Sequence, residues 1–113
     1  MIMIFGVVLA GGIGSRMGNV DKPKQYLLVG EKPIIIHTLE RFYVQNEFEK
    51  IIVLCPEEWV SHTKNLIKKY MKDTDRIVVL RGGDTRNETI MNSLRYIEKE
   101  YGLDDDTIVV THD

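Results

Sequence analysis

The chain has 113 residues, of which 43% are hydrophobic and 28% are charged, and its formal net charge is −2. This length and composition are those of one globular domain with a modest core. The balanced charge provides no general attraction to nucleic acid or to anionic lipid, and the single cysteine, Cys55, excludes an internal disulfide. We therefore expect a cytoplasmic protein with no nucleic-acid or membrane partner, in which any basic site is local.

Four apolar runs without polar alternation predict strands that are covered on both faces. They are residues 2–9, 50–55, 76–80 and 107–111. Between them, apolar residues recur at three- and four-residue steps, which predicts a helix from Pro33 to about residue 45, a second over 57–72, and a third that begins at Asp84 or Thr85. The short apolar run at 26–29 is either a minor strand or a packed loop.

The third helix has clear signals at both ends. Thr85 and Glu88 have the spacing of a capping box, and Gly102 is a stop signal. Its inner face is expected to carry Ile90, Met91, Leu94, Ile97 and Tyr101.

Strands that alternate with helices predict a Rossmann-like α/β fold with an open parallel sheet. Right-handed crossovers place the carboxyl ends of all strands at one edge, where ligands of such sheets bind. Residues 10–18, 55–56, 81–84 and 112–113 are expected to meet there. Because the chain stops directly after a strand, we expect residues 1–113 to be the front part of a longer protein.

The glycine-rich segment that follows the first strand predicts a phosphate site. Residues 9–18 read Leu-Ala-Gly-Gly-Ile-Gly-Ser-Arg-Met-Gly, and residues 22–25 read Lys-Pro-Lys-Gln. A P-loop is excluded because no Gly-Lys-Ser/Thr occurs, and a dinucleotide fingerprint is weak because Met17 stands where its third glycine belongs. The remaining interpretation is a loop that wraps a nucleoside triphosphate with backbone amides and nearby cations.

These motifs resemble the signature of the sugar-phosphate nucleotidyltransferases. Pro23-Lys24-Gln25 looks like the cytidylyltransferase branch, which includes the methylerythritol-4-phosphate and ribitol-5-phosphate enzymes. The second glycine turn, residues 82–89, and the His112-Asp113 pair match the same branch in the same order. Gly12 and the run at 87–92 look more like the ribitol-5-phosphate enzymes.

The resemblance implies transfer of a cytidylyl group from CTP to D-ribitol 5-phosphate, with CDP-ribitol and pyrophosphate as products and teichoic acid of the cell wall as the destination. It also implies Mg²⁺ as cofactor and a homodimeric full-length protein. In this resemblance, residues 1–113 are the N-terminal, CTP-binding part of a single nucleotidyltransferase domain. Two alternatives stay open: transfer to 2-C-methyl-D-erythritol 4-phosphate for isoprenoid synthesis, and a nucleotide-binding module without catalysis.

By the same resemblance, Arg16 and Lys24 stabilise the transition state and Asp113 holds the metal. The residues expected to contact CTP are Leu9, Ala10, Gly11, Gly12, Gly83, Asp84, Thr85, Arg86, Asn87, Glu88 and Thr89.

Several of these residues also have a purely structural interpretation. Leu9 is the last core residue of its strand, and a threonine such as Thr89 in the first turn of a helix commonly bonds to backbone. Asp84 and Arg86 can cap and pair within their own turn. Arg16 and Lys24 can be solvated loop cations.

Overall fold

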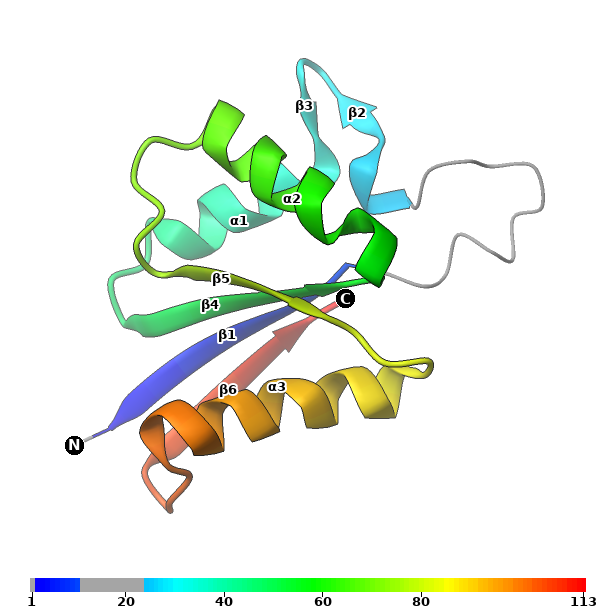
Figure 1. Cartoon of the computed structure of the whole chain (residues 1–113). Helices are drawn as coiled ribbons and strands as arrows, with labels where there is room; N and C mark the ends of the chain where they lie inside the picture. Colours follow the sequence, from blue (N-terminus) through cyan, green and yellow to red (C-terminus); the bar gives the residue numbers. More distant parts are fainter. Residues whose placement is uncertain (1, 11–23) are drawn as a thin grey trace.

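A computed structural model describes residues 2–10 and 24–113 (Figure 1). The main strands are β1 (Met3–Leu9), β4 (Phe48–Cys55), β5 (Ile77–Arg81) and β6 (Thr107–His112). The helices are α1 (Ile34–Tyr43), α2 (Glu57–Tyr70) and α3 (Arg86–Tyr101). A 3-10 helix, η2 (Lys24–Tyr26), leads into a small antiparallel hairpin of β2 (Leu28–Val29) and β3 (Lys32–Pro33).

The four main strands form one parallel sheet in the order β5-β4-β1-β6. The chain adds β4 and β5 on one side of β1 and then crosses to add β6 on the other side. The predicted fold class is therefore confirmed. The strand order reverses at β1, and such a reversal creates the crevice in which open α/β sheets bind ligands.

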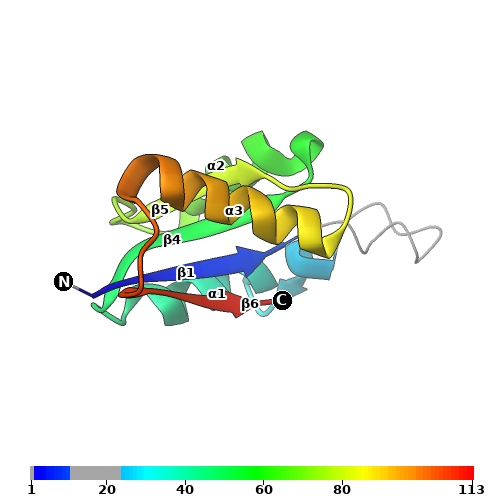
Figure 2. The same cartoon turned by 90° about the horizontal axis from the view of Figure 1, so that it is seen from below.

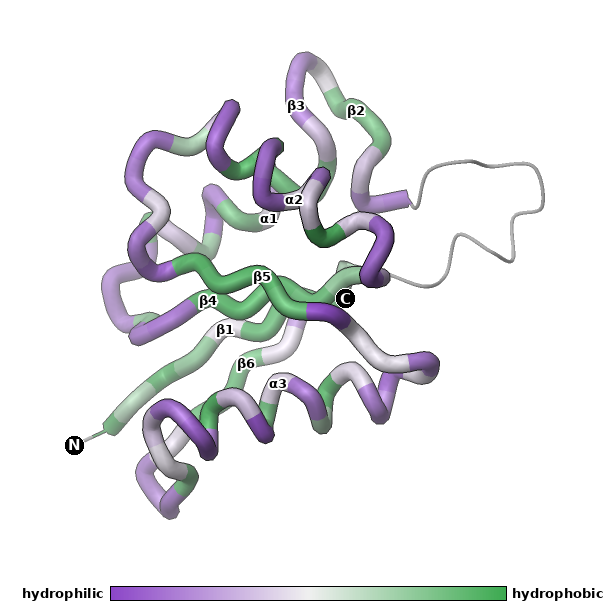
Figure 3. The backbone as a smooth tube through the Cα atoms, in the orientation of Figure 1, coloured by the Kyte–Doolittle hydropathy of each residue, from purple (hydrophilic) through white to green (hydrophobic). Residues whose placement is uncertain are grey.

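Helices cover both faces of the sheet. Helices α1 and α2 lie on one face and α3 lies on the other, as Figures 1 and 2 show. Alternation along β4 serves both layers, because Ile51 and Val53 belong to the core under α1 and α2, whereas Ile52 and Leu54 belong to the core under α3. Figure 3 shows largely hydrophobic inner strands between helices in which hydrophilic and hydrophobic residues alternate.

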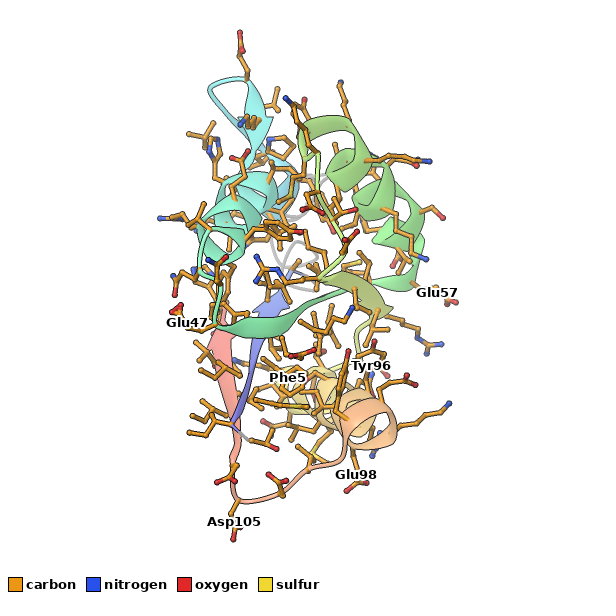
Figure 4. The ribbon with its side chains drawn as sticks, turned by 90° about the vertical axis from the view of Figure 1, so that its left-hand side faces the viewer. Phe5, Glu47, Glu57, Tyr96, Glu98 and Asp105 are labelled. Atoms are coloured by element: carbon orange, nitrogen blue, oxygen red, sulfur yellow. The ribbon has the colours of Figure 1, made fainter. Side chains whose placement is uncertain are left out.

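The core under α3 has fewer buried residues than the core under α1 and α2 in the described part of the chain. Its fully buried members are Phe5, Val7, Ile52, Leu54 and Ile97. In Figure 4, Phe5 and Tyr96 both point into this layer, whereas Glu57 and Glu98 point away from the protein.

Element boundaries agree with the prediction to within a few residues. The hairpin shows that residues 28–29 form a minor strand, and the turn between β2 and β3 includes Gly30 at a φ of 68°. β4 begins two residues earlier than predicted, at Phe48, because that side chain is buried beside β1.

The prediction for Met91 was wrong. Its side chain is 45% exposed, whereas Ser93 is fully buried. Because a helix turns about 100° per residue, Ile90, Ser93 and Ile97 lie on one line facing the sheet, and Met91 falls on the flank of that line. In the described part of the chain, no helix is both long and apolar enough to cross a membrane.

Candidate functional site

The carboxyl ends of the strands form the edge at which the sequence places the site. Beyond the strand ends, backbone pairing continues for one residue, since the Ala10 N–H donates to the Leu54 carbonyl and the Gly82 N–H to the Cys55 carbonyl, both at 2.8 Å. Ala10 is fully buried. Leu9 is half-buried and packs against the core under α3, so its structural interpretation is correct, and its contact with CTP stays a prediction.

The predicted residues Gly11, Gly12 and Arg16 lie outside the described residues. Lys24 opens η2, and its side chain is exposed. Next to it, the Gln25 Oε1 atom is buried and has no hydrogen-bond partner in the part of the chain that the structure describes. Because its side chain is exposed, Lys24 is available to an anionic ligand at this edge.

The second glycine turn is held by its own side chains. The Thr85 hydroxyl caps α3 by accepting from the Glu88 N–H at 3.1 Å, and the Glu88 carboxylate accepts from the Asp84 N–H at 3.1 Å. The predicted capping-box pair is therefore present, with the return bond made to the residue before the cap. Thr89 accepts from the Gly83 N–H and donates to the Thr85 carbonyl, each at 2.9 Å.

The structural interpretation of Thr85, Glu88 and Thr89 is therefore observed, and their contacts with CTP stay predictions. Asp84 and Asn87 present exposed side chains. The glycine at 83 is required by close approach, because a Cβ there would lie 2.4 Å from the Glu88 Cβ.

Arg86 and Asp113 join the start of α3 to the end of β6. The Arg86 Nε donates to both carboxylate oxygens of Asp113, at 3.1 and 3.2 Å. This corrects the interpretation in which Arg86 pairs within its own turn. Both side chains are more than half exposed, at 56% and 60%, so the pair contributes little to stability. The pair places a cation and a carboxylate together at the carboxyl end of β6, the strand next to β1.

Burial sets the chemistry of the groups beneath this edge. It raises the pKa of the Tyr26 hydroxyl well above its ordinary range, and it raises the pKa of the Cys55 thiol. Both groups are therefore neutral near pH 7 and are no nucleophiles there.

Two other features lie apart from the predicted residues. A shallow groove on the hairpin and α1 is lined by Val29, Ile34, His37, Glu40, Arg41 and Val44, none of which is a predicted site residue. Within residues 2–10 and 24–113, no three His, Cys, Asp or Glu side chains are grouped so that they could hold a metal ion.

Comparison with known sequences gives a relative that shares most of this chain. The ribitol-5-phosphate cytidylyltransferase of Lactiplantibacillus plantarum is 54% identical over 111 residues, which are 98% of this chain and 47% of that protein. The chain therefore spans about half the length of the curated relative that it matches.

Solved structures share the fold. The 4-diphosphocytidyl-2C-methyl-D-erythritol synthase from Anaerococcus prevotii is 26% identical with a TM-score of 0.71, and the match covers 99% of this chain and 43% of that chain. A second crystal structure of 4-diphosphocytidyl-2C-methyl-D-erythritol synthase is 21% identical with a TM-score of 0.72, over 100% of this chain and 46% of that chain.

The family model that matches the chain is that of 2-C-methyl-D-erythritol 4-phosphate cytidylyltransferase, IspD, and the match runs over residues 4–113. It includes the turn before α3, the strands that carry the edge, and Lys24. The expected cytidylyltransferase resemblance is thereby confirmed, and the chain belongs to the IspD family.

Proposed function

We propose that the full-length protein transfers the cytidylyl group of CTP to D-ribitol 5-phosphate, giving CDP-ribitol and pyrophosphate. The observation that carries the proposal is the 54% identity to a ribitol-5-phosphate cytidylyltransferase over 98% of this chain. The run Asn87-Glu88-Thr89-Ile90-Met91-Asn92 supports the same acceptor, because it looks like the ribitol-5-phosphate enzymes.

In this reaction, a phosphate oxygen of the acceptor forms a bond to the α-phosphorus of CTP. The bond from that phosphorus to the bridging oxygen breaks, and pyrophosphate leaves with the electron pair. The acceptor phosphate is already ionised, so the chemistry depends on positioning the reactants and on stabilising negative charge. The exposed ammonium of Lys24 supports this role at the strand edge, and Arg16 is the proposed second cation.

Asp113 fits the proposed Mg²⁺ cofactor. Mg²⁺ usually takes one or two carboxylates and completes its shell with substrate phosphates and water. The exposed carboxylate of Asp113 directly follows β6, and its partner is the exposed Arg86. When bound, Mg²⁺ would neutralise phosphate charge, and Asp113 would hold it.

Two further parts of the proposal rest on the resemblance to the ribitol-5-phosphate enzymes. We propose that the product supplies teichoic acid synthesis for the cell wall and that the full-length protein is a homodimer. We also propose that the reaction takes place in the cytoplasm, a location that the single cysteine favours.

The test is pyrophosphate release by the full-length protein with CTP and Mg²⁺, offered each acceptor separately. Release with D-ribitol 5-phosphate is the expected result. Release only with 2-C-methyl-D-erythritol 4-phosphate would overturn the proposed acceptor. That compound is the acceptor for which the matching family is named. CTP binding without release with either acceptor would favour the non-catalytic module.

A further inference from the structure

Tyr26, two residues after Lys24, is anchored in the aromatic side chains of α2. It is 2% exposed, and its ring stacks on Trp59 with centroids 4.6 Å apart and an interplanar angle of 16°. His62 lies against both rings, with centroid distances of 5.7 Å to Tyr26 and 5.2 Å to Trp59. The last residue of η2 is therefore fixed to a helix that begins about thirty residues later in the chain.

The Tyr26 hydroxyl makes a directed bond inside this anchor. Its oxygen lies 2.5 Å from the Thr63 Oγ1, and Thr63 donates to the Trp59 carbonyl at 2.7 Å. A threonine hydroxyl has one hydrogen and a carbonyl can only accept, so the hydrogen between Tyr26 and Thr63 belongs to Tyr26. Burial favours that neutral, donating form, since it raises the pKa of Tyr26.

Main-chain hydrogen bonds hold the residues on both sides of Tyr26. The Leu27 N–H donates to the Lys24 carbonyl at 3.2 Å, and the Ile34 N–H at the start of α1 donates to the Leu27 carbonyl at 2.9 Å. Lys24 thus has its main chain held by η2 while its side chain is exposed. A lysine whose main chain is already ordered loses less conformational entropy when its side chain binds a triphosphate than a lysine on a mobile segment does.

We propose that Tyr26 is a positioning residue, which holds η2 on Thr63 and Trp59 so that Lys24 is aimed at the phosphates of CTP. The proposal rests on the proposed function. Tyr26 would then act together with the Pro-Lys-Gln segment, because the direction of the Lys24 side chain depends on how η2 is held. Tyr26 itself touches no reacting atom in this proposal.

The experiment uses the full-length protein and the variant Tyr26→Phe, which keeps the ring stack and removes only the hydroxyl. The variant should fold, because Thr63 keeps its bond to the Trp59 carbonyl. We expect kcat to fall about tenfold while KM for CTP changes by less than about twofold, since a misdirected Lys24 is felt chiefly in the transition state. Tyr70→Phe, further along α2 and half-buried on the same core, is the matched control with unchanged kcat.

A double-mutant cycle separates positioning from a general structural effect. In the Lys24→Ala background, Tyr26→Phe should lower kcat by less than about twofold, because the group that it aims is gone. An equal loss of kcat in both backgrounds, or wild-type kcat in Tyr26→Phe, would overturn the proposal. If the wild-type protein releases no pyrophosphate with any acceptor, the proposed function itself fails, and the role of Tyr26 toward Lys24 fails with it.

Hydrogen exchange provides a readout that does not depend on turnover. The Leu27 amide, which donates to the Lys24 carbonyl, should exchange at least about threefold faster in Tyr26→Phe than in the wild-type protein, and at the wild-type rate in Tyr70→Phe. Unchanged exchange in Tyr26→Phe would show that the hydroxyl does not hold η2 and would overturn the proposal.

Discussion

The two ends of the parallel sheet differ in how their polar groups are used. At the amino end, Arg76 donates to three main-chain carbonyls, those of Tyr43, Gln45 and Phe48, the last two at 3.1 and 3.0 Å. Its guanidinium also lies over the Tyr43 ring, 4.2 Å from the centroid. This one side chain therefore joins the end of α1 to the start of β4, and three of its five N–H donors are used for main-chain carbonyls.

At the carboxyl end, the hydrogen bonds hold the backbone and leave charged side chains exposed. Thr85, Glu88 and Thr89 bond within the turn before α3, whereas Lys24, Arg86 and Asp113 are exposed. The amino end therefore uses its guanidinium to join neighbouring elements, whereas the carboxyl end leaves three charged side chains exposed. Four predictions test this contrast.

The largest effect is expected for Lys24→Ala in the full-length protein. We expect kcat to fall by about 10²–10³-fold, as for the loss of one donor to a developing anion, with a smaller loss of CTP affinity. The free energy of unfolding should change by less than about 0.5 kcal/mol, because the side chain is exposed. Lys72→Ala, also at an exposed lysine, is the control, and equal losses of affinity and kcat in Lys24→Ala would favour a binding module.

Arg76→Ala should destabilise the protein at the amino end of the sheet. It removes donors from three carbonyls and a cation–π contact, so the free energy of unfolding should fall by about 2–3 kcal/mol in urea denaturation. The kcat of the folded fraction should stay at the wild-type value. Arg76→Lys should recover less than half of the loss, because a single ammonium cannot reproduce the fork of the guanidinium. Lost turnover at full stability would refute the assignment of the two ends.

Gly83→Ala probes how tightly the turn packs on α3. The added Cβ would lie 2.4 Å from the Glu88 Cβ, so the first turn of α3 must move, at a cost of about 1–3 kcal/mol in unfolding free energy. Gly82→Ala is the matched variant with a smaller expected loss. The two atoms nearest to its Cβ would both belong to the Thr89 side chain, at 3.2 and 3.3 Å. Equal stabilities of the two variants would contradict this packing.

The smallest effect is a fall in stability in alkaline solution. Burial raises the folded-state pKa of Tyr26 and Cys55, so their contribution is fully present below the unfolded pKa values, about 8.5 for Cys and 10 for Tyr, and is lost as the pH rises above them. Each group can add a slope of at most about 1.4 kcal/mol per pH unit. Tyr26→Phe should reduce this slope in unfolding titrations, and an unchanged slope would contradict the role of Tyr26 in it. Part of the slope should remain in the variant, because burial also raises the pKa of Tyr96 and Tyr101.

Local patterns predicted most of the secondary structure. The strands, the three helices, the cap at Thr85 and the stop at Gly102, which has a φ of 81°, all depend on residues within a few positions of one another. The side-chain partners were not predictable in this way. For Arg86, local patterns offered a partner within its own turn as one of two interpretations, whereas its observed partner is Asp113, twenty-seven residues away.

The same limit applies to Tyr26, which the sequence showed only as the start of a short apolar run. Tyr26 is buried because α2 packs over η2, where Thr63 and Trp59 contact the Tyr26 side chain. Arg76 likewise reads as a residue at a strand start until α1 brings the Tyr43 carbonyl to it.

The sequence by itself determined the fold class, the family motifs and the edge of the sheet at which the site is expected, because strand and helix periods and glycine turns are short-range properties. The tertiary structure decided which face of α3 is inward, which charges pair, and what holds Lys24 in place. Those outcomes depend on the distance in space between residues that are far apart in the chain, and packing alone sets that distance.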